Sequence, residues 1–154
     1  MQKIAVYPGT FDPITKGHES IVKRAIKIFD LIYVVIAINE CKKPLFPLEK
    51  RLNWIKKVFE NEKNIIVTTH TGLIVDFCTK VNAQFIIRGV RTSADFEYER
   101  TMAHANKLLN HNIDTILFLT PPELLPINST IVREIIKNNG DVSKFIPDCI
   151  NVYE

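Results

Sequence analysis

The chain has 154 residues, of which 46% are hydrophobic, and its 20 Lys and Arg against 17 Asp and Glu give a net charge of +3. A chain of this size buries roughly two thirds of its unfolded surface, so we expect a single domain over residues 1–154. The small charge imbalance argues against a nucleic-acid partner, and the longest apolar run, Leu31–Ile38, is far shorter than the roughly 20 residues that cross a bilayer.

The three cysteines, Cys41, Cys78 and Cys149, are odd in number and far apart, and no C-x-x-C pair is present. This pattern favours neither a disulfide framework nor a zinc site, and it is typical of reduced thiols in the cytosol. The first residues show no signal-peptide pattern. We therefore expect a cytoplasmic protein without a membrane partner.

The first half of the chain alternates between apolar segments and helical patterns. Residues 3–7 predict a short buried strand, and apolar residues recur at helical spacing over 17–30. The β-branched run 31–38 has no polar alternation, which is typical of a strand covered on both faces of a parallel sheet. A helix over 47–60 and a third strand over 64–69 are expected to follow.

The alternation continues to the end of the chain. We expect a helix over 73–81, a strand over 84–88, a long helix over 94–109, a strand over 115–119 and a helix over 129–138. Five strands separated by helices predict a single-domain, Rossmann-like, doubly wound α/β sheet of five parallel strands.

The residues with unusual chemistry gather directly after the predicted strands. Five loops follow the strand ends, over 8–18, 39–46, 70–74, 88–93 and 120–130. In a doubly wound sheet the ligand binds beyond the carboxyl ends of the strands, which share one edge. We therefore expect these loops to line a common crevice.

The first of these loops, within A-V-Y-P-G-T-F-D-P-I-T-K-G-H over 5–18, has the composition of a phosphate-binding turn. Gly9 permits close backbone approach, and Pro8 and Pro13 stiffen the loop. Gly17 and His18 begin a helix whose free N–H groups attract an anion. The alternative is a plain strand-to-helix connection capped by His18, but such connections usually have about 2 to 6 residues. Neither a P-loop nor a dinucleotide fingerprint is present.

Several segments resemble one family along nearly the whole chain. G-T-F-D-P and T-K-G-H resemble the signature of the nucleotidyltransferase superfamily, whose histidine contacts nucleotide phosphates. I-I-R-G-V-R-T-S-A-D-F-E-Y-E over 86–99, K-K-P-L-F over 42–46 and the ending G-D-V-S-K-F-I-P resemble blocks of the bacterial phosphopantetheine adenylyltransferases. By resemblance, the chain is identified as a member of this family.

The resemblance implies transfer of the adenylyl group of ATP to 4′-phosphopantetheine, giving dephospho-coenzyme A and pyrophosphate in the penultimate step of coenzyme A biosynthesis. It also implies Mg²⁺ with ATP, a homohexamer, and coenzyme A as a feedback ligand. The accepting phosphate is already ionised near neutral pH, so we expect direct in-line attack aided by donors and cations. The alternatives are a related nucleotidyltransferase with another phosphate acceptor and a nucleotide-binding regulatory module.

The residues implied to act in catalysis follow three different strands. By resemblance, His18 binds the α-phosphate, Thr10 lies between the two substrates, and Lys42 reaches the incoming phosphate. Arg88 is implied to bind phosphopantetheine, and its place at the end of an apolar strand also requires an anionic partner. Ile74 is implied to contact the pantetheine chain. From the residues alone, a solvated lysine is the favoured interpretation of Lys42.

The residues implied by resemblance to contact ATP are Thr10, Phe11, His18, Gly89, Val90, Arg91, Glu99, Leu124, Leu125, Pro126, Ile127, Asn128, Ser129 and Thr130. Glu99 is implied to hold the ribose. The alternatives are a surface acid at Glu99 and an ion pair of Arg91 with Asp95 or Glu97. Pro126 and Asn128 depart from the family's serine-rich pattern, which puts the strength of ATP binding in question. No residue is assigned as a metal ligand.

Overall fold

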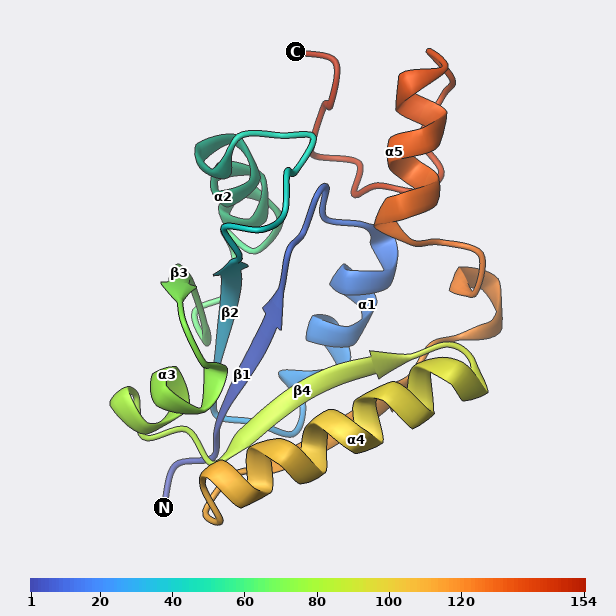
Figure 1. Ribbon diagram of the computed structural model, residues 1–154. Coiled ribbons are helices and arrows are strands. Elements are labelled where there is room, and N and C mark those ends of the chain that lie inside the picture. The colour runs from blue at the N-terminus through green and yellow to red at the C-terminus, as the bar shows by residue number, and fades with distance from the viewer.

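The computed structural model describes residues 1–154 and contains one sheet of five parallel strands with helices on both faces (Figure 1). The strands are β1 (Ile4–Gly9), β2 (Leu31–Ile38), β3 (Ile65–Thr71), β4 (Phe85–Val90) and β5 (Asp114–Leu119). The helices are α1 (Lys16–Ala25), α2 (Leu48–Val58), α3 (Ile74–Lys80), α4 (Ser93–Leu109) and α5 (Ser129–Lys137), with a short 3-10 helix, η1 (Pro122–Leu124), before α5. This architecture confirms the predicted Rossmann-like α/β fold.

The sheet is buried on both faces, and β2 shows the reason for its uninterrupted apolar sequence. Val34 and Ile36 belong to a large core cluster with residues of α1 and α2. Val35, between them, belongs to a smaller cluster with residues of α3. All three side chains are fully buried. Successive side chains of a strand point to opposite faces of the sheet. Because both faces are covered by helices, the run 31–38 is apolar at odd-numbered and even-numbered positions alike.

The strand order places the first and fourth loops side by side. The order is β3-β2-β1-β4-β5, so the chain runs outward from β1 to one edge and then returns to β4 on the other side of β1. Ala5 pairs with Phe85 and Val6 with Ile86. The segments that follow β1 and β4 therefore meet at the point where the strand order reverses, which is where ligands bind in such sheets.

The helices differ from prediction mainly at the end of α1. The predicted helix continues to Asp30, but α1 ends at Ala25 and a turn follows. Asp30 N–H donates to Lys3 O, and the Asp30 carboxylate accepts from Lys3 N–H, so the chain must bend early to return to the sheet. None of the helices combines the length and the apolar character needed to cross a membrane.

Candidate active site

The turn between β1 and α1 is held in an unusual backbone conformation by its own side chains. Phe11 has a φ of 48°, in the left-handed region that most side chains avoid, and its ring is 2% exposed. A Cβ atom on Gly9 would lie 3.0 Å from that ring, which explains the glycine. The turn is therefore packed against the end of β1 and is no loose connection.

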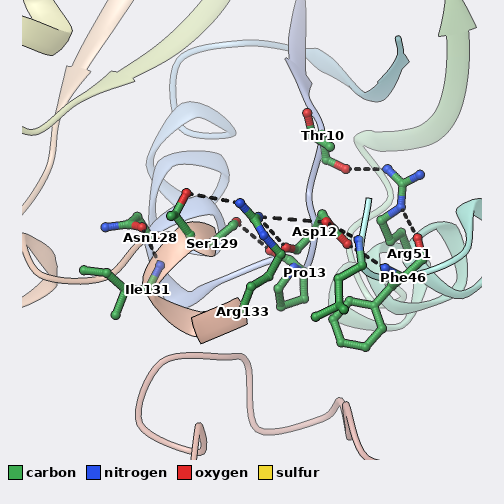
Figure 2. Close-up of polar contacts among 11 residues, drawn as sticks. Thr10, Asp12, Pro13, Phe46, Arg51, Asn128, Ser129, Ile131 and Arg133 are labelled. Carbon is green, nitrogen blue, oxygen red and sulfur yellow. Dashed lines mark hydrogen bonds and ion pairs between the residues drawn. The ribbon is translucent and has the colours of Figure 1, made fainter. Parts of the chain in front are cut away.

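Contacts from α5 hold the same turn from the other side (Figure 2). Ser129 Oγ donates to Pro13 O over 2.8 Å, and Arg133 Nη1 donates to Asp12 O, also over 2.8 Å. Asn128 caps α5 by accepting from Ile131 N–H. These bonds place the N-terminus of α5 next to the N-terminus of α1, although the two segments are far apart in the sequence.

His18 acts as a helix cap and also faces a cavity. Its Nδ1 accepts a hydrogen bond from Thr15 N–H over 3.0 Å, as part of a capping box at the start of α1. A backbone N–H can only donate, so the proton of the neutral imidazole is on Nε2. Burial, together with the nearby charges of Arg88 and Arg91, lowers the pKa of His18 from 6.5 to about 4. At neutral pH, His18 is an uncharged donor.

Arg88 is fixed at the end of β4 by three hydrogen bonds. Its Nε and Nη2 donate to the two carboxylate oxygens of Glu99 over 2.9 and 2.8 Å, and its Nη1 donates to Pro8 O over 2.7 Å. Glu99 is buried, with 7% exposure. The predicted surface-acid alternative for Glu99 is therefore wrong, because this carboxylate is the buried partner of a guanidinium. Of the five Arg88 N–H groups, two remain for a ligand.

Arg91 adopts the ion pair that was the alternative to an ATP contact. Its Nε donates to Asp95 Oδ2 over 3.2 Å, and its backbone N–H donates to the same oxygen. Partial burial acts to raise the pKa of the Asp95 carboxyl group, but the hydrogen bond from the Arg91 backbone N–H and the charge of the Arg91 guanidinium lower it overall. Arg91 nevertheless lines a cavity, so the ion pair does not exclude contact with a ligand.

Two cavities lie beyond the carboxyl ends of the strands. The first, which we call the α1–α5 cavity, has a volume of about 380 Å³ and is mainly polar. The predicted site residues on its wall are Thr10, Phe11, His18, Lys42, Arg88, Gly89, Arg91, Glu99, Ile127, Asn128, Ser129 and Thr130. The loops after β1, β2, β4 and β5 thus meet here, as expected. The loop over 70–74, which was expected to line the same crevice, does not line this cavity.

The second cavity, which we call the α3–α4 cavity, has a volume of about 350 Å³ and a larger share of apolar wall. Ile74 from the start of α3 lies on this wall, together with Met102 and Ala103 of α4. The residues common to both cavities are Pro8, Gly9, Thr10, Lys42, Arg88 and Glu99. The cavities therefore adjoin, and the four polar residues Thr10, Lys42, Arg88 and Glu99 stand between them.

Free backbone donors add to the positive character of the α1–α5 cavity. The N–H groups of Gly17, Ser129 and Thr130, in the first turns of α1 and α5, have no acceptor within the chain. All three residues line the cavity. Two helix N-termini that converge on one space form a strong anion-binding arrangement. The Ser129 hydroxyl proton is already donated to Pro13, so Ser129 offers its backbone N–H rather than its side chain.

Four residues implied to contact ATP do not line the α1–α5 cavity. Val90 is 5% exposed and lies beneath the surface, where its carbonyl accepts from Thr120 N–H. Leu124 is the last residue of η1, and Leu125 and Pro126 follow it; none of the three lines the cavity. Their contribution to ATP binding stays a prediction.

The structure also places in the site several residues that sequence reasoning did not assign. Tyr7 and Asp12 line the α1–α5 cavity, and burial raises the pKa of the Tyr7 hydroxyl. Asp12 stands within the quoted motif G-T-F-D-P, so its carboxylate could have been singled out. Arg51 lies under the site in α2, where nothing in the local sequence distinguishes it from a surface arginine.

The chain is a Rossmann-like protein of the nucleotidyltransferase class. This class is defined here by the five parallel strands, the packed turn after β1 and the two adjoining cavities with polar residues between them. A model of the cytidylyltransferase-like family matches residues 6–135. The fold also resembles the crystal structure of a proposed nicotinate-nucleotide adenylyltransferase from Vibrio parahaemolyticus, with a TM-score of 0.65 over 97% of this chain and 96% of that one. At 18% identity this likeness concerns the fold alone.

Curated relatives narrow the class to one family. A phosphopantetheine adenylyltransferase from Bacteroides fragilis is 49% identical over 143 residues, 93% of this chain and 95% of the relative. One from Nautilia profundicola is 49% identical over 144 residues, 94% of each chain. One from Flavobacterium psychrophilum is 45% identical over 148 residues, 96% and 97% of the two chains. The chain belongs to the phosphopantetheine adenylyltransferase family.

Proposed function

We propose that the chain transfers the adenylyl group of ATP to 4′-phosphopantetheine, giving dephospho-coenzyme A and pyrophosphate in the penultimate step of coenzyme A biosynthesis. The observation that carries this proposal is the pair of adjoining cavities, which share Thr10, Lys42 and Arg88. A transferase that joins two phosphate compounds needs two sites whose contents meet. Identities of 41–49% to curated members of the family, over nearly the whole chain, support the same reaction.

The polarity of the two cavities suggests which substrate each one holds. The α1–α5 cavity, with two helix N-termini and His18, suits the triphosphate of ATP. The α3–α4 cavity has more apolar wall, from residues such as Ile74 and Met102, and suits the uncharged pantetheine chain. The phosphate of phosphopantetheine then lies between them, within reach of the cations Lys42 and Arg88.

The reaction needs alignment and charge stabilisation more than proton transfer. An oxygen of the acceptor phosphate attacks the α-phosphorus of ATP and forms a P–O bond. The bond from that phosphorus to the β-phosphate bridging oxygen breaks, and pyrophosphate leaves with the electron pair. His18 donates its Nε2 proton as a hydrogen bond to an α-phosphate oxygen, where charge accumulates in the transition state. Lys42 and Arg88 hold the attacking phosphate in line.

Nucleotidyl transfer from ATP generally uses a divalent metal, and we propose Mg²⁺ here. The chain has no group of three or more His, Cys, Asp and Glu side chains that could hold a metal. The wall carboxylates of Asp12, Asp95 and Glu99 are each engaged by donors of the protein. This donor set fits Mg²⁺ that is carried on the triphosphate oxygens, as is common for this ion. When bound, the ion neutralises charge on the leaving pyrophosphate.

Pyrophosphate release with different acceptors tests the proposed reaction. The purified protein with ATP, Mg²⁺ and 4′-phosphopantetheine should release pyrophosphate and form dephospho-coenzyme A, and chelation of the metal should lower the rate. Nicotinate mononucleotide, and glycerol 3-phosphate with ATP or CTP, are the matched acceptor controls. Faster turnover of a control acceptor would favour a different nucleotidyltransferase. Tight ATP binding without product from any acceptor would favour a regulatory module.

We also propose a cytoplasmic homohexamer that binds coenzyme A as a feedback ligand. The exposed apolar side chains of α4 support an assembly, and they are Phe96, Tyr98, Met102, Leu108 and Leu109. Coenzyme A contains both the adenylyl and pantetheine groups, so it can occupy both cavities together. Light scattering should give the mass of six chains of 17.7 kDa, and coenzyme A should compete with ATP. A monomer that coenzyme A does not inhibit would contradict both statements.

A further inference from the structure

The arginine of α2 that lies under the site, Arg51, is buried and bonds to the backbone of two separate loops. Its side chain is buried, with 6% exposure for the residue, and no carboxylate lies within ion-pair distance of it. Its Nε donates to Phe46 O over 3.0 Å, and its Nη1 donates to Thr10 O over 2.7 Å (Figure 2). One guanidinium thus joins the segment after β1 to the segment after β2.

A second buried charge makes the reciprocal connection. Asp12 is 3% exposed, and its two carboxylate oxygens accept from Leu45 N–H over 2.8 Å and from Phe46 N–H over 2.9 Å. Asp12 belongs to the segment after β1 and reaches the segment after β2, whereas Arg51 binds the backbone of both. Four hydrogen bonds to main-chain groups therefore fix the two segments relative to each other. We call this arrangement the Asp12–Arg51 clamp.

Burial of this guanidinium carries a desolvation cost. Desolvation lowers the pKa of Arg51, and the charge of Asp12 offsets it only in part. Buried ionic groups are often replaced by apolar side chains without loss of stability. What an apolar side chain cannot do is donate in two divergent directions, and the planar guanidinium is the side chain suited to that task.

The clamp lies directly under the residues that separate the two cavities. Thr10, whose carbonyl is bound by Arg51, lines both cavities. Lys42, which also lines both, stands three and four positions before Leu45 and Phe46, the residues held by Asp12. Arg51 itself lines neither cavity, so it does not contact a bound substrate.

On this basis we propose that Arg51 is a positioning residue, which through the Asp12–Arg51 clamp sets Lys42 relative to Thr10 for in-line attack. The inference rests on the proposed function, since the aligned groups are those of the transfer reaction. A displacement of about 1 Å can cost about 100-fold in rate without loss of binding. Removal of the guanidinium should therefore lower kcat far more than it weakens the binding of ATP.

The test compares Arg51→Met and Arg51→Lys with the wild type. Arg51→Met keeps the apolar stem and loses both bonds, and we expect kcat to fall about 10- to 100-fold with the Kd for ATP changed less than about twofold. Arg51→Lys keeps the charge but can reach only one carbonyl, so its kcat should lie between the two. Ile150→Ala, a buried position that lines neither cavity, is the control for lost stability: it should lower Tm and leave kcat unchanged at temperatures well below Tm.

A double-variant cycle separates positioning from a general defect. In a Lys42→Ala background the placement of Lys42 no longer matters, so Arg51→Met should cost much less in kcat than it does in the wild type. If Arg51→Met does not fold, Arg51→Lys carries the same comparison. An equal loss in both backgrounds, or a wild-type kcat in Arg51→Met, would overturn this inference alone. A wild-type protein that releases no pyrophosphate from ATP and phosphopantetheine would overturn the proposed function as well.

Discussion

Replacement of His18 by alanine removes two interactions, a helix cap and a proposed phosphate contact. Each is made by a different nitrogen of the imidazole ring. Nδ1 caps α1 at Thr15 N–H, and Nε2–H is left for a phosphate oxygen. Loss of one preorganised donor to the transition state costs about 10²- to 10³-fold in turnover, or about 2.7–4 kcal/mol. Loss of the cap leaves the N–H of the buried Thr15 unpaired, which costs about 1–3 kcal/mol of folding free energy.

The two effects can be separated with a second substitution. His18→Gln supplies a side-chain oxygen at the third helical position, as in the usual capping box, so it should recover the folding free energy lost in His18→Ala. Its amide N–H groups lie beside the capping oxygen and not across a ring from it, so they do not take the place of the imidazole Nε2–H and turnover should stay low. The assays are urea unfolding and single-turnover pyrophosphate release with both substrates saturating. Near wild-type turnover of His18→Ala would refute the role of His18, and equal stability of the two variants would refute the cap.

Three further predictions concern charge and helix capping. Since the pKa of His18 is about 4 in the folded chain and 6.5 in the unfolded chain, the unfolded state binds more protons between these values, so stability falls as the pH decreases from 6.5 towards 4. Urea unfolding should show about 2 kcal/mol of this loss between pH 7 and pH 5, and His18→Gln should lack it; equal pH dependence would contradict the low pKa. Glu99→Gln leaves the Arg88 guanidinium without its carboxylate, so we expect about 2 kcal/mol lower stability and a higher KM for phosphopantetheine; an unchanged KM would contradict a link between Glu99 and the acceptor site. Asn128→Ala removes the cap of α5 and should cost about 1 kcal/mol in thermal or urea unfolding, with weaker ATP binding; ATP binding as tight as in the wild type would show that the start of α5 is not used.

The bounds of the strands were predicted closely, because burial of a strand determines its own residues directly. The run 31–38 is apolar at every position since β2 is covered on both faces, and the structure gives the same bounds. The end of α1 was placed five residues too late because the bend after Ala25 depends on the long-range contact of Asp30 with Lys3. Strand order is also a long-range property, and the sequence analysis predicted parallel strands without predicting their order.

The sequence predicted which residues meet in the site, because they lie in loops that follow the strands. It predicted less well which side chains form hydrogen bonds with each other. Thr10, His18, Lys42 and Arg88 meet because the parallel strands before them end at one edge. The bidentate pairing of Arg88 with Glu99 joins a strand to a helix eleven residues away, where the sequence offered several acids. The hydrogen bonds of Arg51 to Thr10 O and Phe46 O could not be predicted from the sequence, because every residue has a backbone carbonyl group that can accept them.

The proposed mechanism requires the triphosphate of ATP to lie in the α1–α5 cavity, against His18. The most direct measurement is a crystal structure with a non-hydrolysable ATP analogue and Mg²⁺. We predict an α-phosphate oxygen about 3 Å from His18 Nε2, with the β- and γ-phosphates at the N–H groups that begin α5. A triphosphate bound outside the α1–α5 cavity, with the imidazole of His18 in contact with none of its oxygens, would contradict the proposed mechanism.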